Sequence, residues 1–481
     1  MDIAQPQAAQ SDLNQISFSK TCMVRLVPDN ISKLRESSES ASLESLDKAK
    51  NVYVENHGCA ANKFDLEIML AHLANAGYRV TEVPRRADIV LINTCGVKKP
   101  TEDRMIERIR KLSRLDKPLI IAGCLPRINF KAVVEAAPGF SAILDPRSID
   151  STFLAVKSAE TGGKNRIFFR REPIAKLSEP KIRLNPHIEI ISIAEGCAGA
   201  CAFCCVRFAR GRLSSYPKAL IAKRVRQAVS EGVREIWLTS QDSGAYGVDR
   251  GTNLSELLKE CSGVEGKFLC RVGMMNPDHI AKILPELIGA YKDEKVFKFL
   301  HLPVQSGDNE TLRRMNRRYT VEEYRRIVCM FRGEIPRITL STDVICGFPG
   351  ESREAFERTV QLVEDVEPDI VNISKFLPRP NTPAAKMDQL DPTEVKDRSR
   401  KLTGLAKSIS LSRNVRWINW EGEILVDERG RDSSWVGRNF AYKPVVVKSG
   451  RNLAGKFLRV RVVKAFRTHL EAEVVDHERD Q

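Results

Sequence analysis

Short apolar runs alternate with helix-like stretches in the first third of the chain. The runs at 51–55, 88–95 and 118–124 are rich in Val, Ile and Leu, as expected of strands buried in a parallel sheet. Between the first two runs, apolar residues over 66–74 recur at the helical period. This alternation of strands and helices predicts an α/β domain built on a parallel sheet, to which we assign residues 49–160.

The same alternation resumes after a stretch near 160–186 that has the composition of a linker. Amphipathic helices, for example at 217–230 and 321–331, separate the apolar runs that follow. Those runs lie at 188–193, 234–239, 268–273, 297–302, 338–346 and 370–373. Six strand–helix units over residues 183–408 predict a partial (β/α)6 barrel, short of the eight units of a closed barrel and open on one side to a large substrate.

Beyond residue 410 the pattern changes to short strands and turns, which predicts a small all-β barrel over 411–477. Between residues 413 and 467, thirteen lysines and arginines stand against five acidic residues. Aromatic residues are interleaved with them, among them Trp420, Trp435, Phe440, Tyr442 and Phe466. Such a segment suits RNA binding through phosphate contacts and base stacking, although core packing would also account for some of the aromatic residues.

Charge, hydropathy and cysteine content together indicate a basic protein without a membrane span. The 481 residues carry a formal net charge of +15, which favours a polyanionic partner, nucleic acid first. We find no apolar stretch long enough to span a membrane and no secretory signal, and the polar residues 1–48 predict a disordered extension. We therefore expect a cytoplasmic protein, in which twelve cysteines indicate metal binding or catalysis more than disulfides.

Three cysteines stand at the spacing C-x3-C-x2-C directly after the first apolar run of the central domain. They are Cys197, Cys201 and Cys204, on the loop that leaves the predicted strand. Three thiolates on one tight loop suit a [4Fe-4S] cluster whose remaining iron is open to a substrate or cofactor. The alternative is zinc, but a structural zinc site prefers four protein ligands, and the adjacent Cys205 would be badly placed as the fourth.

Three further cysteines, Cys59, Cys95 and Cys124, follow separate strands of the N-terminal sheet. The carboxyl ends of parallel strands meet at one edge of a sheet, where ligands bind. The sequence therefore predicts a second site of three thiolates at this edge. The alternative is that each cysteine is a small buried residue.

Together these motifs resemble the methylthiotransferases, which are radical S-adenosylmethionine enzymes with two [4Fe-4S] clusters. The resemblance covers nearly all of residues 50–477. Its N-terminal motifs are Gly58-Cys59-x-x-Asn62-x-x-Asp65, Asn93-Thr94-Cys95 and Ala122-Gly123-Cys124. Its central motifs lie at 303–307 and 342–351, with the aromatic Phe203 before the last cysteine of the loop, and the final segment resembles the RNA-binding TRAM barrel.

The resemblance implies a role for each cysteine set. Cys197, Cys201 and Cys204 would hold the cluster whose open iron chelates S-adenosylmethionine, and Cys59, Cys95 and Cys124 would hold an auxiliary, sulfur-delivering cluster. Phe203, Gln305 and Asp343 are expected cofactor contacts, the last two from strand ends, with a structural polar role as their alternative. We expect a monomer that also needs a one-electron reductant, a sulfur donor and tRNA.

Segments 97–103, 209–217 and 242–247 resemble the archaeal and eukaryotic branch of the family. That branch places a methylthio group on carbon 2 of N6-threonylcarbamoyladenosine beside the anticodon of tRNA. Carbon 2 carries a C–H bond that is not acidic, so a radical cofactor must remove the hydrogen atom.

Three alternatives stay open at this point. The same chemistry could act on isopentenyl-adenosine in tRNA or on an aspartate of a ribosomal protein. The chain could also be a non-catalytic iron-sulfur protein that binds RNA. One residue departs from the family pattern: Asn381 stands where Pro-Arg-Pro-Gly-Thr-Pro has glycine, and because asparagine tolerates a left-handed backbone, we expect the turn to survive.

Overall fold

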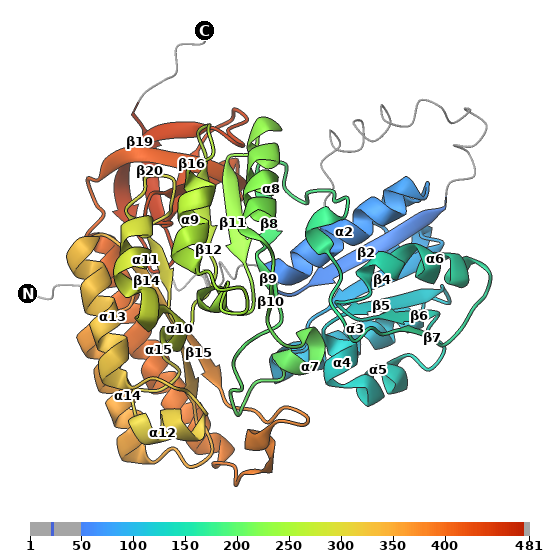
Figure 1. The fold of residues 1–481 in the computed structure, drawn as a ribbon, viewed down its shortest axis with the longest axis horizontal. Helices are drawn as coiled ribbons and strands as arrows, with labels where there is room; N and C mark the ends of the chain where they lie inside the picture. Colours follow the sequence, from blue (N-terminus) through green and yellow to red (C-terminus); the bar gives the residue numbers. More distant parts are fainter. Residues whose placement is uncertain (1–20, 24–49, 476–481) are drawn as a thin grey trace, which may run out of the picture.

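The N-terminal domain is a seven-stranded sheet covered by helices (Figure 1). The computed structural model describes residues 21–23 and 50–475, so the expected disordered extension lies outside the described residues except for 21–23. The strands are β1 (Thr21–Met23), β2 (Asn51–His57), β3 (Arg79–Thr81), β4 (Ile89–Thr94), β5 (Leu119–Gly123), β6 (Ala142–Leu144) and β7 (Arg166–Phe168). They lie in the order β1-β2-β4-β5-β6-β7, with β3 beside β2. Every pair is parallel except β1 with β2, so the predicted parallel α/β sheet is confirmed.

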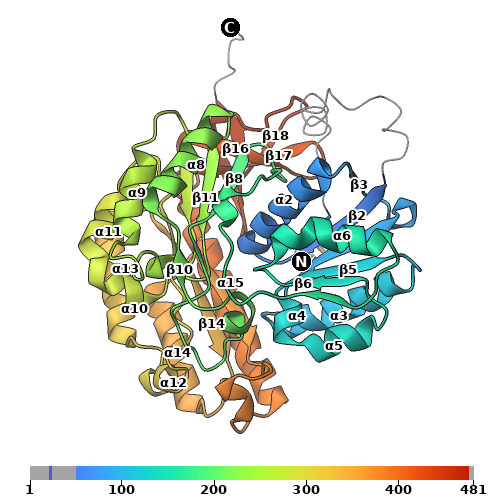
Figure 2. The same cartoon turned by 45° about the vertical axis from the view of Figure 1, so that its right-hand side comes forward.

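Helices pack on both faces of this sheet (Figure 2). One face carries α2 (Ala60–Asn75), η3 (Ile149–Ser151) and α6 (Thr152–Glu160), and the other carries α3 (Lys99–Ser113), α4 (Leu125–Ile128) and α5 (Phe130–Ala136). The short turn η2 (Pro84–Arg86) precedes β4. Within β4, Leu91 joins the core beneath α2 whereas Val90 and Ile92 join the core beneath α3. Since both faces of the strand are buried, its sequence is apolar throughout instead of alternating.

Six parallel strands form the central domain and confirm the predicted partial barrel. They are β8 (Ile188–Ser192), β11 (Glu235–Thr239), β12 (Leu269–Val272), β13 (Phe299–His301), β14 (Thr339–Cys346) and β15 (Ile370–Lys375). Hydrogen bonds join them as two ladders of three, β12-β11-β8 and β13-β14-β15, and a single bridge between Cys270 and Val296 links the two. The small antiparallel pair β9 (Ala194–Glu195) and β10 (Ser214–Ser215) closes the loop that carries the three clustered cysteines.

Helices and short turns connect these strands. The helices are α7 (Val206–Arg210), α8 (Lys218–Ser230), α9 (Leu254–Ser262), α10 (Pro277–Ile280), α11 (Leu284–Tyr291), α12 (Asn309–Arg314), α13 (Val321–Glu334), α14 (Arg353–Val366) and α15 (Pro392–Val415). The turns are η4 (Lys176–Ser178), η5 (Ser243–Ala245), η6 (Ala281–Ile283) and η7 (Pro383–Lys386). Thr320 and Glu323 form a reciprocal capping box at α13, which fixes the start of that helix.

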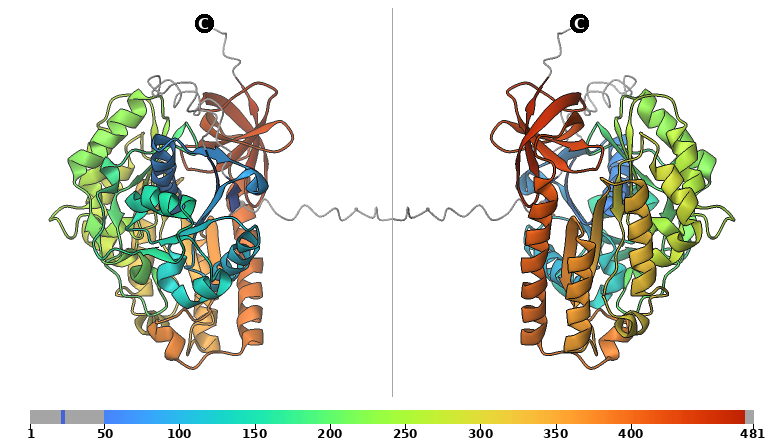
Figure 3. Two further views of the ribbon diagram at one scale, coloured as in Figure 1. Left: turned by 90° about the vertical axis from the view of Figure 1, so that its right-hand side faces the viewer. Right: turned by 90° about the vertical axis from the view of Figure 1, so that its left-hand side faces the viewer.

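The longest of these helices, α15, leads from the central domain to the C-terminal barrel (Figure 3). Asp391 caps its first turn by accepting hydrogen bonds from the backbone N–H groups of Thr393 and Glu394, and Pro392 supplies the preset first helical residue. Despite its 24 residues, α15 is too polar to lie in a bilayer. Within residues 21–23 and 50–475, none of the helices combines the length and the hydropathy that crossing a membrane requires.

The C-terminal strands close into the expected all-β barrel. They are β16 (Glu421–Arg429), β17 (Ser434–Asn439), β18 (Pro444–Lys448), β19 (Phe457–Ala465) and β20 (Leu470–Val474), in the order β16-β17-β18-β20-β19. The hydrophobic pattern alone does not reveal β17, because Ser434, Gly437 and Asn439 have low strand propensity. Pairing with β16 and β18 on either side forms the strand instead.

One expectation about connections was wrong. The segment near 160–186 is not linker throughout, because residues 166–168 form β7 and pair in parallel with β6 at the edge of the N-terminal sheet. Arg166 and Ile167 are exposed, so the backbone pairs while the side chains give no burial pattern to read. The N-terminal sheet therefore continues beyond residue 160.

The turn at Asn381 has the backbone that the sequence predicted. Asn381 has a φ of 62°, in the left-handed region that glycine adopts freely and asparagine tolerates best among the other residues. Its side chain is exposed, so packing places no further demand on this position.

We predict that Asn381→Gly preserves stability whereas Asn381→Val lowers the free energy of unfolding by about 1–2 kcal/mol, because a β-branched side chain clashes in a left-handed backbone. Urea denaturation of the two variants measures the difference. Lys386→Val, at a nearby exposed position without a positive φ, is the control and should change stability by less than about 0.5 kcal/mol. Equal stability of Asn381→Val and Asn381→Gly would contradict this account of the turn.

Candidate functional site

The loop between β9 and α7 brings Cys197, Cys201 and Cys204 together, as their spacing predicted. A side chain on Gly199 would touch the sulfur atoms of both Cys197 and Cys201, at 3.5 and 3.8 Å from its Cβ, so two of the thiols flank this glycine. The loop begins at Gly196, whose φ is 70° and where a Cβ would lie 2.0 Å from the Arg212 carbonyl oxygen. Only glycine permits this close approach of the two backbone segments.

Residues 315–317, far along the chain, bind this loop through hydrogen bonds. Arg317, three residues beyond α12, donates a hydrogen bond from Nη1 to the Cys201 Sγ at 3.2 Å. Asn316 Nδ2 donates to the Ala200 carbonyl at 2.7 Å, and Ala202 N–H donates to the Met315 carbonyl at 2.9 Å. Sequence reasoning missed Arg317, because no local motif marks a residue 116 positions away from its cysteine partner.

Burial disfavours the thiolate form of Cys197 and of Cys204. Burial raises the pKa of Cys197 to about 11, and the negative charge of Asp242 adds to the effect. Burial also raises the pKa of Cys204 above its usual range, and Cys201 contributes further. Backbone N–H groups of Gly199 and Val206 point at the sulfurs of Cys197 and Cys204, at 3.3 and 3.5 Å. Burial makes an uncompensated thiolate unfavourable here, yet backbone N–H groups point at the sulfur atoms. This combination suits thiolates whose charge is balanced by bound iron.

Cys59, Cys95 and Cys124 lie at the carboxyl-terminal edge of the N-terminal sheet. Cys59 precedes α2, Cys95 follows β4, and Cys124 lies between β5 and α4. Burial raises the pKa of Cys95 to about 12, and the charges of Cys124 and Cys59 raise it further, so the three thiols are close neighbours. Burial likewise raises the pKa of Cys124 to about 11, against the opposing charge of Arg210.

Asn62 joins two members of this second set. Its Oδ1 lies 3.6 Å from the Cys59 Sγ and 3.9 Å from the Cys124 Sγ, and its Nδ2 donates to the Thr94 carbonyl at 3.0 Å. Asn62 lies three residues after Cys59 on the first turn of α2, so the helical period places both at one end of the helix.

The helices that follow members of the two cysteine sets meet at the interface between the N-terminal and central domains. Helix α7, which follows the clustered cysteines, packs on α4, which follows Cys124. Cys205 and Ala209 of the central domain share a small apolar cluster with Cys124 and Ile128 of the N-terminal domain. Cys205 thus faces the second set and packs there, in keeping with the expectation that it is badly placed as a fourth ligand for the first.

Four buried charged residues tie the two domains together beside the second cysteine set. Asp65 accepts from Lys176 Nζ at 2.6 Å and from Arg210 Nη2 at 2.7 Å. Glu195 lies 3.2 Å from Lys176 and 3.4 Å from Arg210. All four side chains are at most 4% exposed, and Arg210 also reaches the Asn62 Oδ1 at 3.4 Å. We call these four residues the buried charge cluster.

Neither cysteine set is a ready-made site for one ion. In the part of the chain that the structure describes, no three Cys, His, Asp or Glu side chains converge on a single-metal position. Tetrahedral zinc bonded to sulfur at about 2.3 Å needs ligands roughly 3.8 Å apart. A [4Fe-4S] cluster bonds each of its thiolates through a different iron, so its ligands need not converge on one point.

The predicted cofactor contacts Gln305 and Asp343 lie beside each other, but only Gln305 lies beyond a strand, four residues past β13, whereas Asp343 lies within β14, three residues before its end. Gln305 N–H donates to the Asp343 carbonyl at 2.8 Å, and Gln305 adopts a φ of 71°, which is uncommon outside glycine. The Asp343 carboxylate is bound by His301 Nε2 at 3.3 Å and by Asn372 Nδ2 at 2.8 Å. Burial pushes the Asp343 pKa upward, but these contacts and the charge of His301 outweigh it and hold the pKa below its usual value.

The third predicted contact, Phe203, has a packing role in this structure. Its ring lies against an apolar cluster that includes Met315, Phe348 and Phe376 beneath the cysteine loop. On the N-terminal side, Lys98 reaches across to the Ser374 hydroxyl of β15 at 2.8 Å. Sequence reasoning missed Lys98, His301 and Asn372 as site residues, because only the folded barrel brings them together.

The aromatic residues predicted to face RNA divide into two groups. Trp420, Trp435 and Phe440 pack against the core of the C-terminal barrel, and Tyr442 contacts Phe297 of the central domain. Phe466 is 39% exposed and stacks on His469 at 4.7 Å. Of the five, Phe466 is exposed and the other four are partly buried, so Phe466 is the most open to stacking on a base and the basic charge carries most of the RNA-binding expectation.

We predict that Asp65→Asn destabilises the protein by about 3–5 kcal/mol, because it leaves the buried charge cluster with an excess positive charge. Asp103→Asn removes an exposed carboxylate paired with Lys99 on α3 and should cost about 0–1 kcal/mol. Urea denaturation of both variants provides the comparison. Wild-type stability of Asp65→Asn would show that the cluster does not hold the domains together.

Three protein families match the chain in the order of its domains. Residues 51–145 match Uncharacterized protein family UPF0004, residues 191–363 match the Radical SAM superfamily, and residues 421–475 match the TRAM domain. The radical SAM match implies a [4Fe-4S] cluster and S-adenosylmethionine. Among solved structures, the radical S-adenosylmethionine methyltransferase TsrM from Kitasatospora setae is similar at a TM-score of 0.52 and 15% identity. That likeness, over 70% of this chain and 77% of the other, concerns the fold alone.

Curated relatives span nearly the whole chain. A "Probable threonylcarbamoyladenosine tRNA methylthiotransferase" of Pyrococcus horikoshii is 45% identical over 426 residues, which cover 88% of this chain and 99% of the relative. The "Threonylcarbamoyladenosine tRNA methylthiotransferase" of Xenopus laevis is 36% identical and that of Homo sapiens 38%, covering 95% and 89% of this chain and 83% and 74% of theirs. With such identity over its length and two cysteine sets at one interface, the chain belongs to the family of threonylcarbamoyladenosine tRNA methylthiotransferases.

Proposed function

We propose that this protein transfers a methylthio group to carbon 2 of N6-threonylcarbamoyladenosine beside the anticodon of tRNA. The observation that carries the proposal is the packing of α7, which follows one three-cysteine set, on α4, which follows a member of the other. A reaction that needs both a radical and a sulfur atom at one carbon requires two such sites side by side. The relatives' printed activity supplies the substrate.

Each cysteine set has the donor chemistry of a [4Fe-4S] site. Cys197, Cys201 and Cys204 would hold one cluster, and Cys59, Cys95 and Cys124 would hold the second, auxiliary cluster. When bound, the first supplies an electron for cleavage of S-adenosylmethionine and the second supplies the sulfur that is transferred.

Side chains of this protein position the cysteine ligands and line the proposed S-adenosylmethionine site. Arg317 orients the Cys201 sulfur, and the Asn62 amide lies between Cys59 and Cys124. We propose that Phe203, Gln305 and Asp343 line the S-adenosylmethionine site, with the Asp343 carboxylate held ionised and oriented by His301 and Asn372. An ionised carboxylate at this point is suited to a cationic cofactor.

The function divides among three domains. We propose that residues 49–160, together with β7, deliver the sulfur. Residues 183–408 would form the radical, and residues 411–477 would bind the tRNA. The protein would act as a cytoplasmic monomer, supplied by a one-electron reductant and a sulfur donor.

The cluster assignment predicts that anaerobically reconstituted protein holds two [4Fe-4S] clusters. Replacing Cys59, Cys95 and Cys124 together by Ala should remove about half of the iron and sulfide, while 5′-deoxyadenosine still forms from S-adenosylmethionine under dithionite. Cys201→Ala should abolish 5′-deoxyadenosine formation. Cys329→Ala, an exposed cysteine on α13 outside both sets, is the control. Full iron content in the triple variant would rule out the auxiliary cluster.

The substrate assignment predicts one change in the tRNA of a strain that lacks the gene. Mass spectrometry of digested tRNA should show N6-threonylcarbamoyladenosine without its methylthio group, and the wild-type gene should restore the methylthiolated nucleoside. Restoration with Cys124→Ala or Cys201→Ala should fail. Loss of a methylthiolated isopentenyl-adenosine, with the threonylcarbamoyl nucleoside unchanged, would contradict this assignment.

A further inference from the structure

Helix α15 has two faces that differ in charge: acidic and basic residues nearly balance on one, and the other is basic. On one face, Arg398 pairs with Glu351 and Glu394, and Lys401 pairs with Glu357. A cavity of about 670 Å³ on that face is lined by four acidic and three basic residues, so its charges nearly balance. The other face carries basic residues along the length of the helix that leads to the C-terminal barrel.

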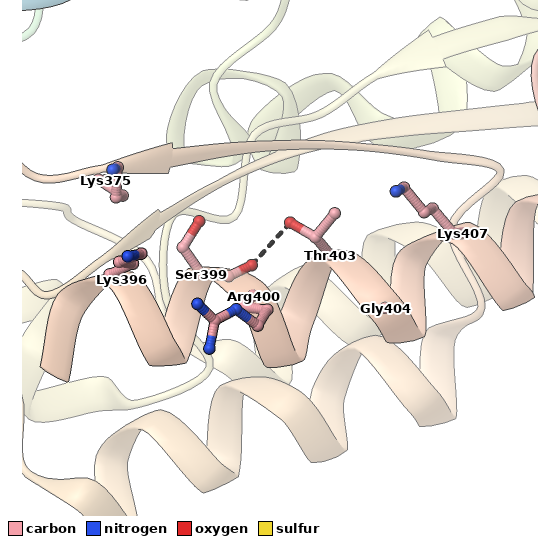
Figure 4. Close-up of a pocket in the computed structure, with 7 residues that line it drawn as sticks. All are labelled: Lys375, Lys396, Ser399, Arg400, Thr403, Gly404 and Lys407. Carbon is pink, nitrogen blue, oxygen red and sulfur yellow. Dashed lines mark hydrogen bonds between the residues drawn. The ribbon is translucent and has the colours of Figure 1, made fainter. Parts of the chain in front are cut away.

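That other face, together with the end of β15, forms what we call the basic groove (Figure 4). It encloses about 350 Å³ and is lined by four cations and two hydroxyl-bearing residues, Lys375, Lys396, Arg400, Lys407, Ser399 and Thr403. The helix residues recur at intervals of three or four, so the helical period places them in one stripe. None of the residues that line the groove is acidic.

The positive charge of the basic groove is largely uncompensated. Within residues 50–475, no carboxylate lies within ion-pair distance of Lys375, Lys396 or Lys407, and Arg400 has only an exposed contact with Asp397 at 3.1 Å. Gly404 leaves open space in the stripe, since nothing lies within 4 Å of the position a Cβ would take. The Thr403 hydroxyl donates to the Ser399 carbonyl at 2.6 Å, so the lysines and Arg400 supply the groove's chemistry (Figure 4). Cations with little compensation and room for a ligand are what phosphate groups require.

The groove connects the two parts of the molecule that the proposed function assigns to RNA and to chemistry. Lys407 lies two turns before the end of α15, where the C-terminal barrel begins. Lys375 ends β15 and follows Ser374, which accepts the hydrogen bond from Lys98, three residues past Cys95. From Lys396 to Lys407 the helix rises about 16 Å, which is longer than one free anion can span.

We propose that the basic groove binds consecutive backbone phosphates of the tRNA and guides the strand from the C-terminal barrel to the cysteine sites. The inference rests on the proposed function and adds a second RNA contact outside the C-terminal barrel. The length of the stripe favours a polyanion over inorganic phosphate, and its position between the C-terminal barrel and the cysteine sites favours RNA over an acidic protein.

Gly404 offers a test that leaves the fold intact. Gly404→Glu adds a carboxylate in open space on a helix, where glutamate is a better helix former than glycine. It should weaken tRNA binding several-fold, whereas Gly404→Ala should bind as wild type does. Both variants should cleave S-adenosylmethionine at the wild-type rate without tRNA. Equal tRNA affinity of the two variants would overturn the proposal.

The salt dependence of binding counts the phosphate contacts. Replacing Lys396 and Lys407 by Ala should flatten the log–log plot of tRNA affinity against salt by roughly 1.4–1.8, because each lost contact accounts for roughly 0.7–0.9. Lys401→Ala, on the opposite face, is the matched control and should keep the wild-type slope. Inorganic phosphate should compete no better than sulfate at equal ionic strength.

Two results would count against the groove. If replacing Lys396 and Lys407 leaves the salt slope of tRNA affinity unchanged, the proposal is overturned. It is also overturned if that variant binds tRNA as the wild type does but is reduced more slowly by an acidic electron-carrier protein. In either case, methylthiolated nucleoside formed by the wild type would leave the proposed function standing. Absence of that product from the wild type would instead refute the function itself.

Discussion

The structure depends on the burial of four charges between two domains. Asp65 comes from α2, Lys176 from η4, Glu195 from β9 and Arg210 from α7, so the cluster joins elements on both sides of the interface. Taking these charges out of water is costly, and their mutual contacts compensate, together with hydrogen bonds from Ser192 to Glu195 and from Arg210 to Asn62. Since no member can leave without stranding the others, the domains are held in one relative position.

That position determines where the chemistry can occur. Arg210 follows the clustered cysteines by six residues and reaches Asn62, which contacts Cys59 and Cys124. A second tie links Arg379, just before the turn at Asn381, to Glu102 on α3 across the same interface. The two ties thus use Asp65 of the Gly-Cys-x-x-Asn-x-x-Asp motif and Arg379 of the segment before Asn381, and both fix the N-terminal domain against the central domain.

The sequence predicted features that depend on local spacing. The C-x3-C-x2-C loop, the three cysteines at strand ends and the left-handed turn at Asn381 all follow from nearby residues. It missed contacts between distant segments, such as Arg317 with Cys201 and Lys176 with Asp65, which lie 116 and 111 residues apart. It also missed β7, because exposed side chains on a paired backbone leave no hydrophobic pattern.

The central claim is that both cysteine sets act on one substrate held at the interface. The most direct test is the yield of methylthiolated nucleoside per 5′-deoxyadenosine in Arg210→Lys. This variant keeps the charge of the buried cluster but loses the guanidinium fork, whose Nη2 reaches Asp65 and Asn62 and whose Nη1 reaches Glu195. The account predicts that cleavage of S-adenosylmethionine continues while this yield falls well below that of the wild type. A yield equal to the wild type would contradict the claim that the interface couples the two sites.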